Sequence, residues 1–302
     1  MKLRYWLLFI KSGLFASALS FASAQPNTME CFSVDDAKSR FQVAGGEDAN
    51  VEEYPFIVSL KIETPSGPAE CGGSIVGAGW VLTAAHCVSD SNLHPDHPDF
   101  ALSPTNITVI RPDPLGRPFG ASRQVSDVFV HPEFDWSMLD SDVALLRLST
   151  PFIQNEATPV AIADVILDQA FASGGECARV AGWGRTDTLN SYNQIISAGK
   201  VTDQLQDLNL SIVSVNSCRA RYPDYITPQM LCAGDGIEGK NTCKGDSGGP
   251  LIVDFGALPV QVGVVSWAYG CAQQDHYSVF ARVGASGIQN WIGSILSGGS
   301  GN

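Results

Sequence analysis

Short apolar segments, rich in β-branched residues and separated by glycine and proline, run through most of the chain. The clearest are residues 56–62, 73–85, 143–148, 177–183, 260–267 and 277–283. Segments of this length and composition predict the strands of an antiparallel all-β protein. A helical pattern is seen only around residues 214–222 and in residues 286–296, where Ser286 is the expected N-cap.

The N-terminus is predicted to be a processing signal rather than part of the fold. Lys2 and Arg4 precede a mostly apolar run, and small residues at positions 22–24 suit cleavage before Gln25. A membrane anchor is the alternative, but Lys11 divides the apolar run into pieces too short to span a bilayer. We therefore expect residues 1–24 to be the signal peptide of a secreted, extracellular protein.

Composition and charge narrow the classes of partner. With 44% hydrophobic and 16% charged residues, the 302-residue chain has the composition of a folded globular protein. Its formal net charge is −13, and cleavage after residue 24 would remove three basic residues and no acidic ones, leaving −16. Such a charge repels phosphate backbones and anionic lipids, so neither nucleic acid nor a membrane surface is an expected partner.

Eight cysteines in an exported chain favour disulfides. A metal cluster is the alternative, but Cys-x-x-Cys spacing is absent. Neither a metal nor a cofactor is expected.

A serine in "NTCKGDSGGPLIV", residues 241–253, carries the strongest chemical signal. A serine hydroxyl becomes a nucleophile when a base removes its proton and a third group orients that base. His86, which ends an apolar segment and precedes Cys87, is the candidate base. Asp142, at the edge of another apolar segment, is the candidate orienting carboxylate, with Asp140 as its rival. The remaining histidines are interpreted as solvated loop residues: His94, His97, His131 and His276.

Taken together, "TAAHC", "DVALL" and "GDSGGP", in the order His, Asp, Ser and with "VAGG" near the start, resemble the chymotrypsin and trypsin family of serine endopeptidases. The resemblance runs from Val43 to about Leu296, which would form the protease domain. It implies two antiparallel six-stranded β-barrels, about residues 43–150 and 151–283, followed by a C-terminal α-helix. Residues 297–302 are expected to be a flexible tail.

The same resemblance implies the site and its partners. His86 would act as general base and then acid, Asp142 would orient it, and Ser247 would attack the scissile carbonyl. The backbone N–H groups of Gly245 and Ser247 would form the oxyanion hole. The implied partners are protein or peptide substrates, protease inhibitors and an activating protease, and we expect a monomer.

The resemblance also implies activation by a cut before Val43, whose new ammonium would pair with Asp246. Residues 25–42 would then be a propeptide. Gln42 precedes Val43 and the nearest basic residue is Arg40, so a trypsin-like activator would cut two residues early. The hypothesis is that another protease cuts after Gln42, or that trimming follows.

Three disulfides follow from the resemblance: Cys71–Cys87, Cys218–Cys232 and Cys243–Cys271. Cys31 and Cys177 are left over, because Val253 and its neighbours, where the family usually provides the partner of Cys177, are not cysteines. We therefore expect a Cys31–Cys177 bridge that tethers the cut propeptide. Asn106 and Asn209 lie in glycosylation sequons, and Asn106 is preferred because it follows a long polar loop.

The primary specificity pocket is where the sequence departs from trypsin-like enzymes. Asn241, six residues before Ser247, would sit at the base, where those enzymes have an aspartate. Ala268 and Ser278 would narrow the walls, so we expect small or medium uncharged P1 residues. In the counter-interpretation, Asn241 bonds a polar P1 residue or Asp275 binds a basic one. Residues 266–268 (Ser266, Trp267 and Ala268) would pair with the substrate backbone as an added strand.

Two other functions are alternatives to a protease. A catalytically silent homologue that acts as a binding protein or inhibitor is the alternative, although the three triad candidates argue against it. A lectin-like or structural all-β protein would leave the three motifs unexplained.

Overall fold

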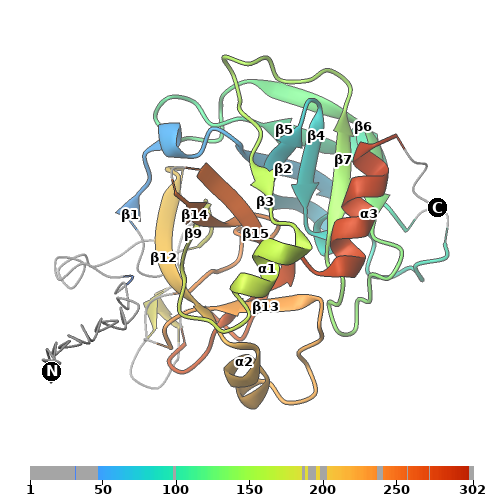
Figure 1. The fold of residues 1–302 in the computed structure, drawn as a ribbon. Helices are drawn as coiled ribbons and strands as arrows, with labels where there is room; N and C mark the ends of the chain where they lie inside the picture. Colours follow the sequence, from blue (N-terminus) through green and yellow to red (C-terminus); the bar gives the residue numbers. More distant parts are fainter. Residues whose placement is uncertain are drawn as a thin grey trace, which may run out of the picture.

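The computed structural model describes residue 31 and residues 47–298, apart from 98–99, 186–187, 190–194, 198–202, 237–240, 257 and 272. The expected signal peptide, most of the expected propeptide and Val43 lie outside the described residues. The described chain forms two six-stranded antiparallel β-barrels and a C-terminal helix, which confirms the predicted fold class (Figure 1).

The first barrel closes in the order β2-β3-β4-β7-β6-β5. Its strands are β2 (Ile57–Thr64), β3 (Gly67–Gly77), β4 (Trp80–Thr83), β5 (Ile107–Ile110), β6 (Ser122–Val130) and β7 (Ala144–Leu148).

The second barrel has the order β12-β13-β16-β15-β14-β9 and is closed by pairing of β9 with β12. Its strands are β9 (Cys177–Gly182), β12 (Gln206–Val213), β13 (Met230–Ala233), β14 (Pro250–Phe255), β15 (Leu258–Ala268) and β16 (Ser278–Arg282). Along β12, buried residues alternate with more exposed ones, as expected for a strand with one face on the core.

Several shorter elements lie outside the twelve barrel strands. β1 (Glu47–Asp48) pairs with β12, and β8 (Ala161–Ile162) runs parallel to β15. β10 (Thr188–Leu189) and β11 (Ile195–Ser197) form a separate pair. The 3-10 helices are η2 (Val51–Glu53), η3 (Ala85–Cys87) and η4 (Pro104–Asn106).

Three α-helices are present in the described chain, one more than the sequence pattern predicted. α2 (Val215–Arg221) begins after Ser214, whose side chain accepts the N–H of Ser217. α3 (Ser286–Leu296) is the predicted C-terminal helix, but Ala285 is its N-cap, so Ser286 is its first helical residue. The additional helix, α1 (Val165–Ala170), is only six residues long and is capped by Asp164, and its short apolar pattern gave no helical signal.

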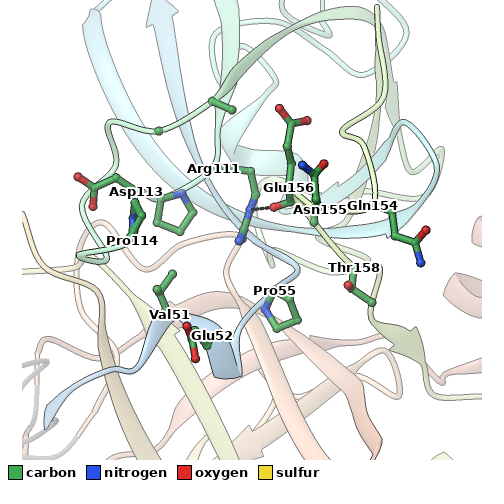
Figure 2. Close-up of a pocket in the computed structure, with 14 residues that line it drawn as sticks. Val51, Glu52, Pro55, Arg111, Asp113, Pro114, Gln154, Asn155, Glu156 and Thr158 are labelled. Atoms are coloured by element: carbon green, nitrogen blue, oxygen red, sulfur yellow. Dashed lines mark hydrogen bonds between the residues drawn. The ribbon is translucent and has the colours of Figure 1, made fainter.

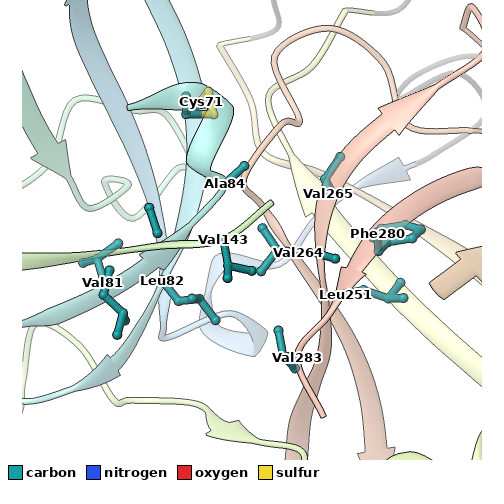
Figure 3. Packing of buried hydrophobic residues seen from close by; sticks show 14 of the residues in the cluster. Cys71, Val81, Leu82, Ala84, Val143, Leu251, Val264, Val265, Phe280 and Val283 are labelled. Atoms are coloured by element: carbon teal, nitrogen blue, oxygen red, sulfur yellow. A yellow bond between two sulfur atoms is a disulfide. The ribbon is translucent and has the colours of Figure 1, made fainter. Parts of the chain in front are cut away.

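One hydrophobic cluster joins the barrels. Leu82 and Val143 from the first barrel and Val264 and Phe280 from the second belong to the same buried group, and Figure 3 shows them facing one another. Although α3 follows the second barrel in sequence, it lies against the first, beside β6 and β7 in Figure 1. The ring of Trp291 in α3 lies 5.0 Å from that of His131, centroid to centroid. The barrels therefore pack into one body, and residues from both meet at their junction.

Candidate active site

A histidine and a carboxylate meet where two strands of the first barrel end. His86 lies in η3, directly after β4, and Asp142 lies just before β7. Nδ1 of His86 is 2.7 Å from Oδ2 of Asp142, and the His86 backbone N–H donates to Oδ1 at 2.9 Å. Since Asp142 contacts both the ring and the backbone of His86, it fixes the position of the residue and the orientation of its ring.

The second barrel also contributes a hydrogen bond to the buried carboxylate of Asp142. Ser266 Oγ, in β15, donates to Asp142 Oδ2 at 2.5 Å. Burial by itself lowers the pKa of His86, but the charge of Asp142 and its hydrogen bond raise it, and the net pKa is raised. Asp142 therefore stabilises the imidazolium that forms when His86 accepts a proton.

The rival carboxylate has a different partner. Asp140 Oδ1 accepts a 2.5 Å hydrogen bond from Thr227 Oγ1, so Asp142 is the carboxylate that contacts His86.

The other histidines differ in their surroundings. His94 and His97 are exposed, and His276 lies beside Arg221, whose Nη2 is 2.6 Å from its Nε2. The interpretation of His131 as solvated was wrong, because it is only 4% exposed and packs on Trp291.

Backbone contacts place Ser247, from the second barrel, near the end of β4. Its carbonyl accepts the N–H of Gly72, and Gly248 donates to the carbonyl of Val265. A Cβ placed on Gly248 would lie 2.3 Å from Oγ1 of Thr83, the last residue of β4. The turn after Ser247 thus packs directly against the strand end that leads to His86, and only glycine permits so close an approach.

The backbone before Ser247 is held in an unusual conformation. Gly245 has φ +103°, a region that residues with a side chain rarely adopt. The amides of Asp246, Gly248 and Gly249 donate to backbone carbonyls, whereas within the described residues no acceptor is assigned to those of Gly245 and Ser247. Backbone amides that have no acceptor within the protein can stabilise an oxyanion.

Asp246 is buried, with 1% of its surface exposed. The N–H groups of Gly184 and Cys243 donate to its two oxygens at 2.8 and 2.9 Å. Burial raises the pKa of Asp246 to about 6, against the lowering effect of these two hydrogen bonds. No cationic group among the described residues compensates this carboxylate.

A cavity of about 250 Å³ adjoins Ser247. Ser266, Trp267 and Ala268 line it, together with Thr242, Cys243, Lys244, Val265, Gly270 and Cys271. The expected added-strand segment 266–268 therefore borders this cavity.

Two expected pocket residues lie behind the cavity wall instead. Asn241 and Ser278 are both fully buried, and neither lines the cavity. The Ser278 hydroxyl donates to Oδ1 of Asn241, while Nδ2 of Asn241 has no partner. Asp275 is exposed and also does not line the cavity. Among the described residues that line the cavity there is no carboxylate, and Lys244 is the charged one.

Four disulfides are present: Cys31–Cys177, Cys71–Cys87, Cys218–Cys232 and Cys243–Cys271. Of these, Cys71–Cys87 adjoins the candidate histidine and Cys243–Cys271 joins two walls of the 250 Å³ cavity. Among the described residues, the one cluster of potential metal-ligating side chains consists of Cys71, His86 and Cys87. Because both thiols are oxidised, this cluster is not a metal site.

Sequence reasoning missed two neighbours of the triad candidates. It gave Ser266 only a backbone role, whereas its hydroxyl bonds Asp142. It did not consider Trp136, whose ring meets that of His86 edge-on at 6.4 Å between centroids. Neither residue lies in a motif, so only the fold brings them to the site.

The structure also shows the surroundings of the two sequons. Asn209 is exposed on β12, whereas Asn106 is half-buried in η4, so accessibility favours the sequon that was not preferred. In the described part of the chain, no helix has the length and apolar character needed to cross a bilayer.

Comparison with known proteins places these features in a family. The family model described as Trypsin matches residues 43–292. The chain is 34% identical over 244 residues to a trypsin of Saccharopolyspora erythraea, covering 80% of this chain and 94% of the relative. It is 32% identical over 258 residues to trypsin of Sus scrofa, covering 85% and 96%, and 31% identical over 295 residues to Trypsin 5G1 of Aedes aegypti, covering 96% and 97%. With its two barrels, this chain belongs to the trypsin family and is a chymotrypsin-like serine endopeptidase.

Proposed function

We propose that His86, Asp142 and Ser247 form the catalytic triad of this endopeptidase. Two observations support this proposal: His86 is held 2.7 Å from Asp142, and the turn after Ser247 packs on the end of β4, the strand that precedes His86. Chains of this family act on protein or peptide substrates.

In this mechanism, His86 Nε2 takes the proton of Ser247 as Oγ attacks the scissile carbonyl. The carbonyl oxygen becomes an oxyanion that the amides of Gly245 and Ser247 stabilise. The imidazolium then gives its proton to the leaving amine as the C–N bond breaks, which leaves an acyl-enzyme. Water, activated by the same imidazole, hydrolyses the ester and regenerates Ser247.

The proposed P1 preference is for small or medium uncharged residues. The counter-hypothesis is a basic P1 residue, which the trypsin-named relatives favour. The described residues that line the cavity beside Ser247, however, include no carboxylate to pair with such a residue. Lys244 at its wall would repel a cation, and Ala268 carries a methyl group into the slot. Asp275, the remaining acidic candidate, lies exposed outside the cavity.

The proposed route to the active protein is export as a zymogen. Residues 1–24 would be removed as a signal peptide, and a cut after Gln42 would free Val43. The buried, uncompensated Asp246 carboxylate supports this step, because a new ammonium would neutralise it and order the adjacent Gly245 amide. The Cys31–Cys177 bridge would keep residues 25–42 attached after the cut.

The proposal also covers the compartment, the glycosylation sites and the partners of the mature protein. The four disulfides fit an oxidising, extracellular compartment. Asn209 and Asn106 are the proposed glycosylation sites. The proposed mature chain comprises the protease domain, residues 43–296, and the tail, and it is a monomer. Its proposed protein partners, besides substrates, are protease inhibitors and an activating protease. A catalytically silent binding protein is the alternative, favoured only by the unusual Gln42–Val43 junction.

Hydrolysis of a peptide library with varied P1 residues tests the proposal, after N-terminal sequencing of the secreted protein has established Val43 as its first residue. Cleavage after Ala, Val or Leu that is lost in Ser247→Ala supports both the triad and the narrow neutral pocket. Cleavage after Arg or Lys would refute the specificity alone. No cleavage by the correctly processed chain would favour the silent binding protein.

A further inference from the structure

A second cavity, of about 540 Å³, opens between three segments that are far apart in sequence (Figure 2). Its walls come from residues 51–55, 111–121 and 154–158, and it shares no lining residue with the cavity beside Ser247. The proposed catalytic mechanism gives it no role.

A buried arginine points into this cavity. Arg111, directly after β5, is 9% exposed, and Figure 2 shows its guanidinium at the centre of the lining residues. Its Nε donates to the carbonyl of Glu156 at 3.0 Å, and its Nη1 donates to the carbonyls of Ile57 at 2.5 Å and Tyr54 at 3.2 Å. These bonds fix the guanidinium, while Nη2 makes no hydrogen bond to the described residues.

The guanidinium also lacks a carboxylate partner among the described residues. Of the acidic residues nearby, Asp113 pairs with Arg117 and Glu156 pairs with Arg123, each with an N–O distance of 2.6 Å. In Figure 2 both carboxylates point away from Arg111. Burial without a counter-charge lowers the pKa of Arg111 to about 10. Carbonyl dipoles therefore fix this cation without neutralising it.

The opposite wall of the cavity supplies neutral polar groups. Gln154, Asn155 and Thr158 are exposed there, and their amide and hydroxyl groups can donate hydrogen bonds. Glu52, also exposed, is the lining acid without an ion pair. A buried arginine beside neutral donors suits a carboxylate, because a charge-assisted hydrogen bond to Nη2 would supply the missing counter-charge.

We propose that this cavity is a carboxylate-binding site, in which Nη2 of Arg111 binds the anion and the 154–158 wall completes its hydrogen bonds. Two sources share this chemistry: a small free carboxylate, and the C-terminal carboxylate of a peptide, which is the group that peptide hydrolysis releases. The site is separate from the catalytic cleft, so its occupancy does not depend on the proposed triad.

Calorimetric titration of the Ser247→Ala chain at constant chloride tests the proposal without turnover of the peptides. The probes are acetate, N-acetyl-D-Ala-D-Ala as the free acid, and the same peptide as its C-terminal amide; the D configuration keeps both peptides out of the catalytic cleft, which is proposed to bind L-peptides. We expect saturable binding of the two carboxylates and none of the amide. Tighter binding of the peptide acid than of acetate assigns the site to peptide C-termini, and equal binding assigns it to small carboxylates.

Rim variants separate a binding site from a purely structural arginine. Asn155→Asp and Gln154→Glu are nearly isosteric, lie on the exposed wall and leave the bonds of Arg111 intact. An added charge roughly 6 Å from the ligand in water should weaken carboxylate binding by about threefold. Glu52→Gln removes a negative charge and should strengthen it by a similar factor. No saturable binding of either carboxylate, equal binding of acid and amide, or unchanged affinity in all three variants would overturn the proposal.

Discussion

The buried Asp246 carboxylate makes the stability of the uncut chain depend on pH in an unusual direction. Its pKa is raised from 3.8 to about 6, so between these values the folded carboxyl holds a proton that the unfolded one has released. The contribution of Asp246 to the unfolding free energy is therefore fully present below pH 3.8 and is lost as the pH rises towards 6. This is the reverse of an ion-paired aspartate, whose pKa is lowered by folding.

The size of the effect follows from the shift. At roughly 1.4 kcal/mol per pKa unit, the change from 3.8 to about 6 corresponds to about 3 kcal/mol of unfolding free energy. Asp246→Asn carries a neutral group of nearly the same shape at every pH, so it should lack this dependence. The variant will have a different absolute stability, because its amide nitrogen cannot accept the N–H groups that the carboxylate accepts.

The assay is urea unfolding at a series of pH values between about 4 and 7.5, with both chains carrying Ser247→Ala to prevent self-cleavage. Subtracting the variant from the parent cancels the other titrating groups, and the difference should fall by about 3 kcal/mol as the pH rises. Parallel profiles would refute the reasoning. In a chain cut before Val43, a paired ammonium would lower the pKa of Asp246, and the slope should reverse.

Three further substitutions test the site. Asp142→Asn should lower kcat by about 10⁴-fold. It should also move the acid limb of the pH–kcat/KM profile to lower pH, because the carboxylate that raises the pKa of His86 is lost. Asp140→Asn is the matched control and should leave the acid limb unchanged. Ala268→Gly should raise kcat/KM for a Phe P1 substrate relative to an Ala one by about 10- to 100-fold, measured with paired peptides. Gly184→Ala would place a Cβ 2.3 Å from the carboxylate of Asp246 and should lower the unfolding free energy, measured in urea, by about 1–3 kcal/mol. The control Gly293→Ala, whose Cβ would meet nothing within 4 Å, should not lower it.

The sequence predicted the fold class because most strand and helix signals in this chain, although short, have a clear apolar pattern. The apolar segments at 56–62 and 260–267 fall within β2 and β15 or extend one residue beyond them, and the pattern of Ile288, Ile292 and Ile295 marks the buried face of α3. Such signals depend on burial of one face, which each segment encodes by itself. α1 was missed because its six residues are too few to show a helical period.

The site was predictable only as far as its residues lie in motifs. The motifs nominate His86, Asp142 and Ser247 separately, whereas the contact of Ser266 with Asp142 depends on how β15 of one barrel meets the end of a loop in the other. His131 was interpreted as a loop residue because a proline follows it, but it is buried and packs on Trp291, a residue 160 positions away. Contacts of this kind arise from tertiary packing, which a local pattern does not contain.

Membership of the trypsin family determines the reaction and the fold, but it does not determine the P1 residue. Recognition of Arg or Lys requires a negative group that the side chain can reach, and here Asn241 is neutral, buried and bonded to Ser278 behind the cavity wall. Introducing a carboxylate at position 241 would therefore place a charge beside Ser278 without an open path to the substrate. A basic P1 specificity would require changes at both positions, because the wall has to open before the charge can be used.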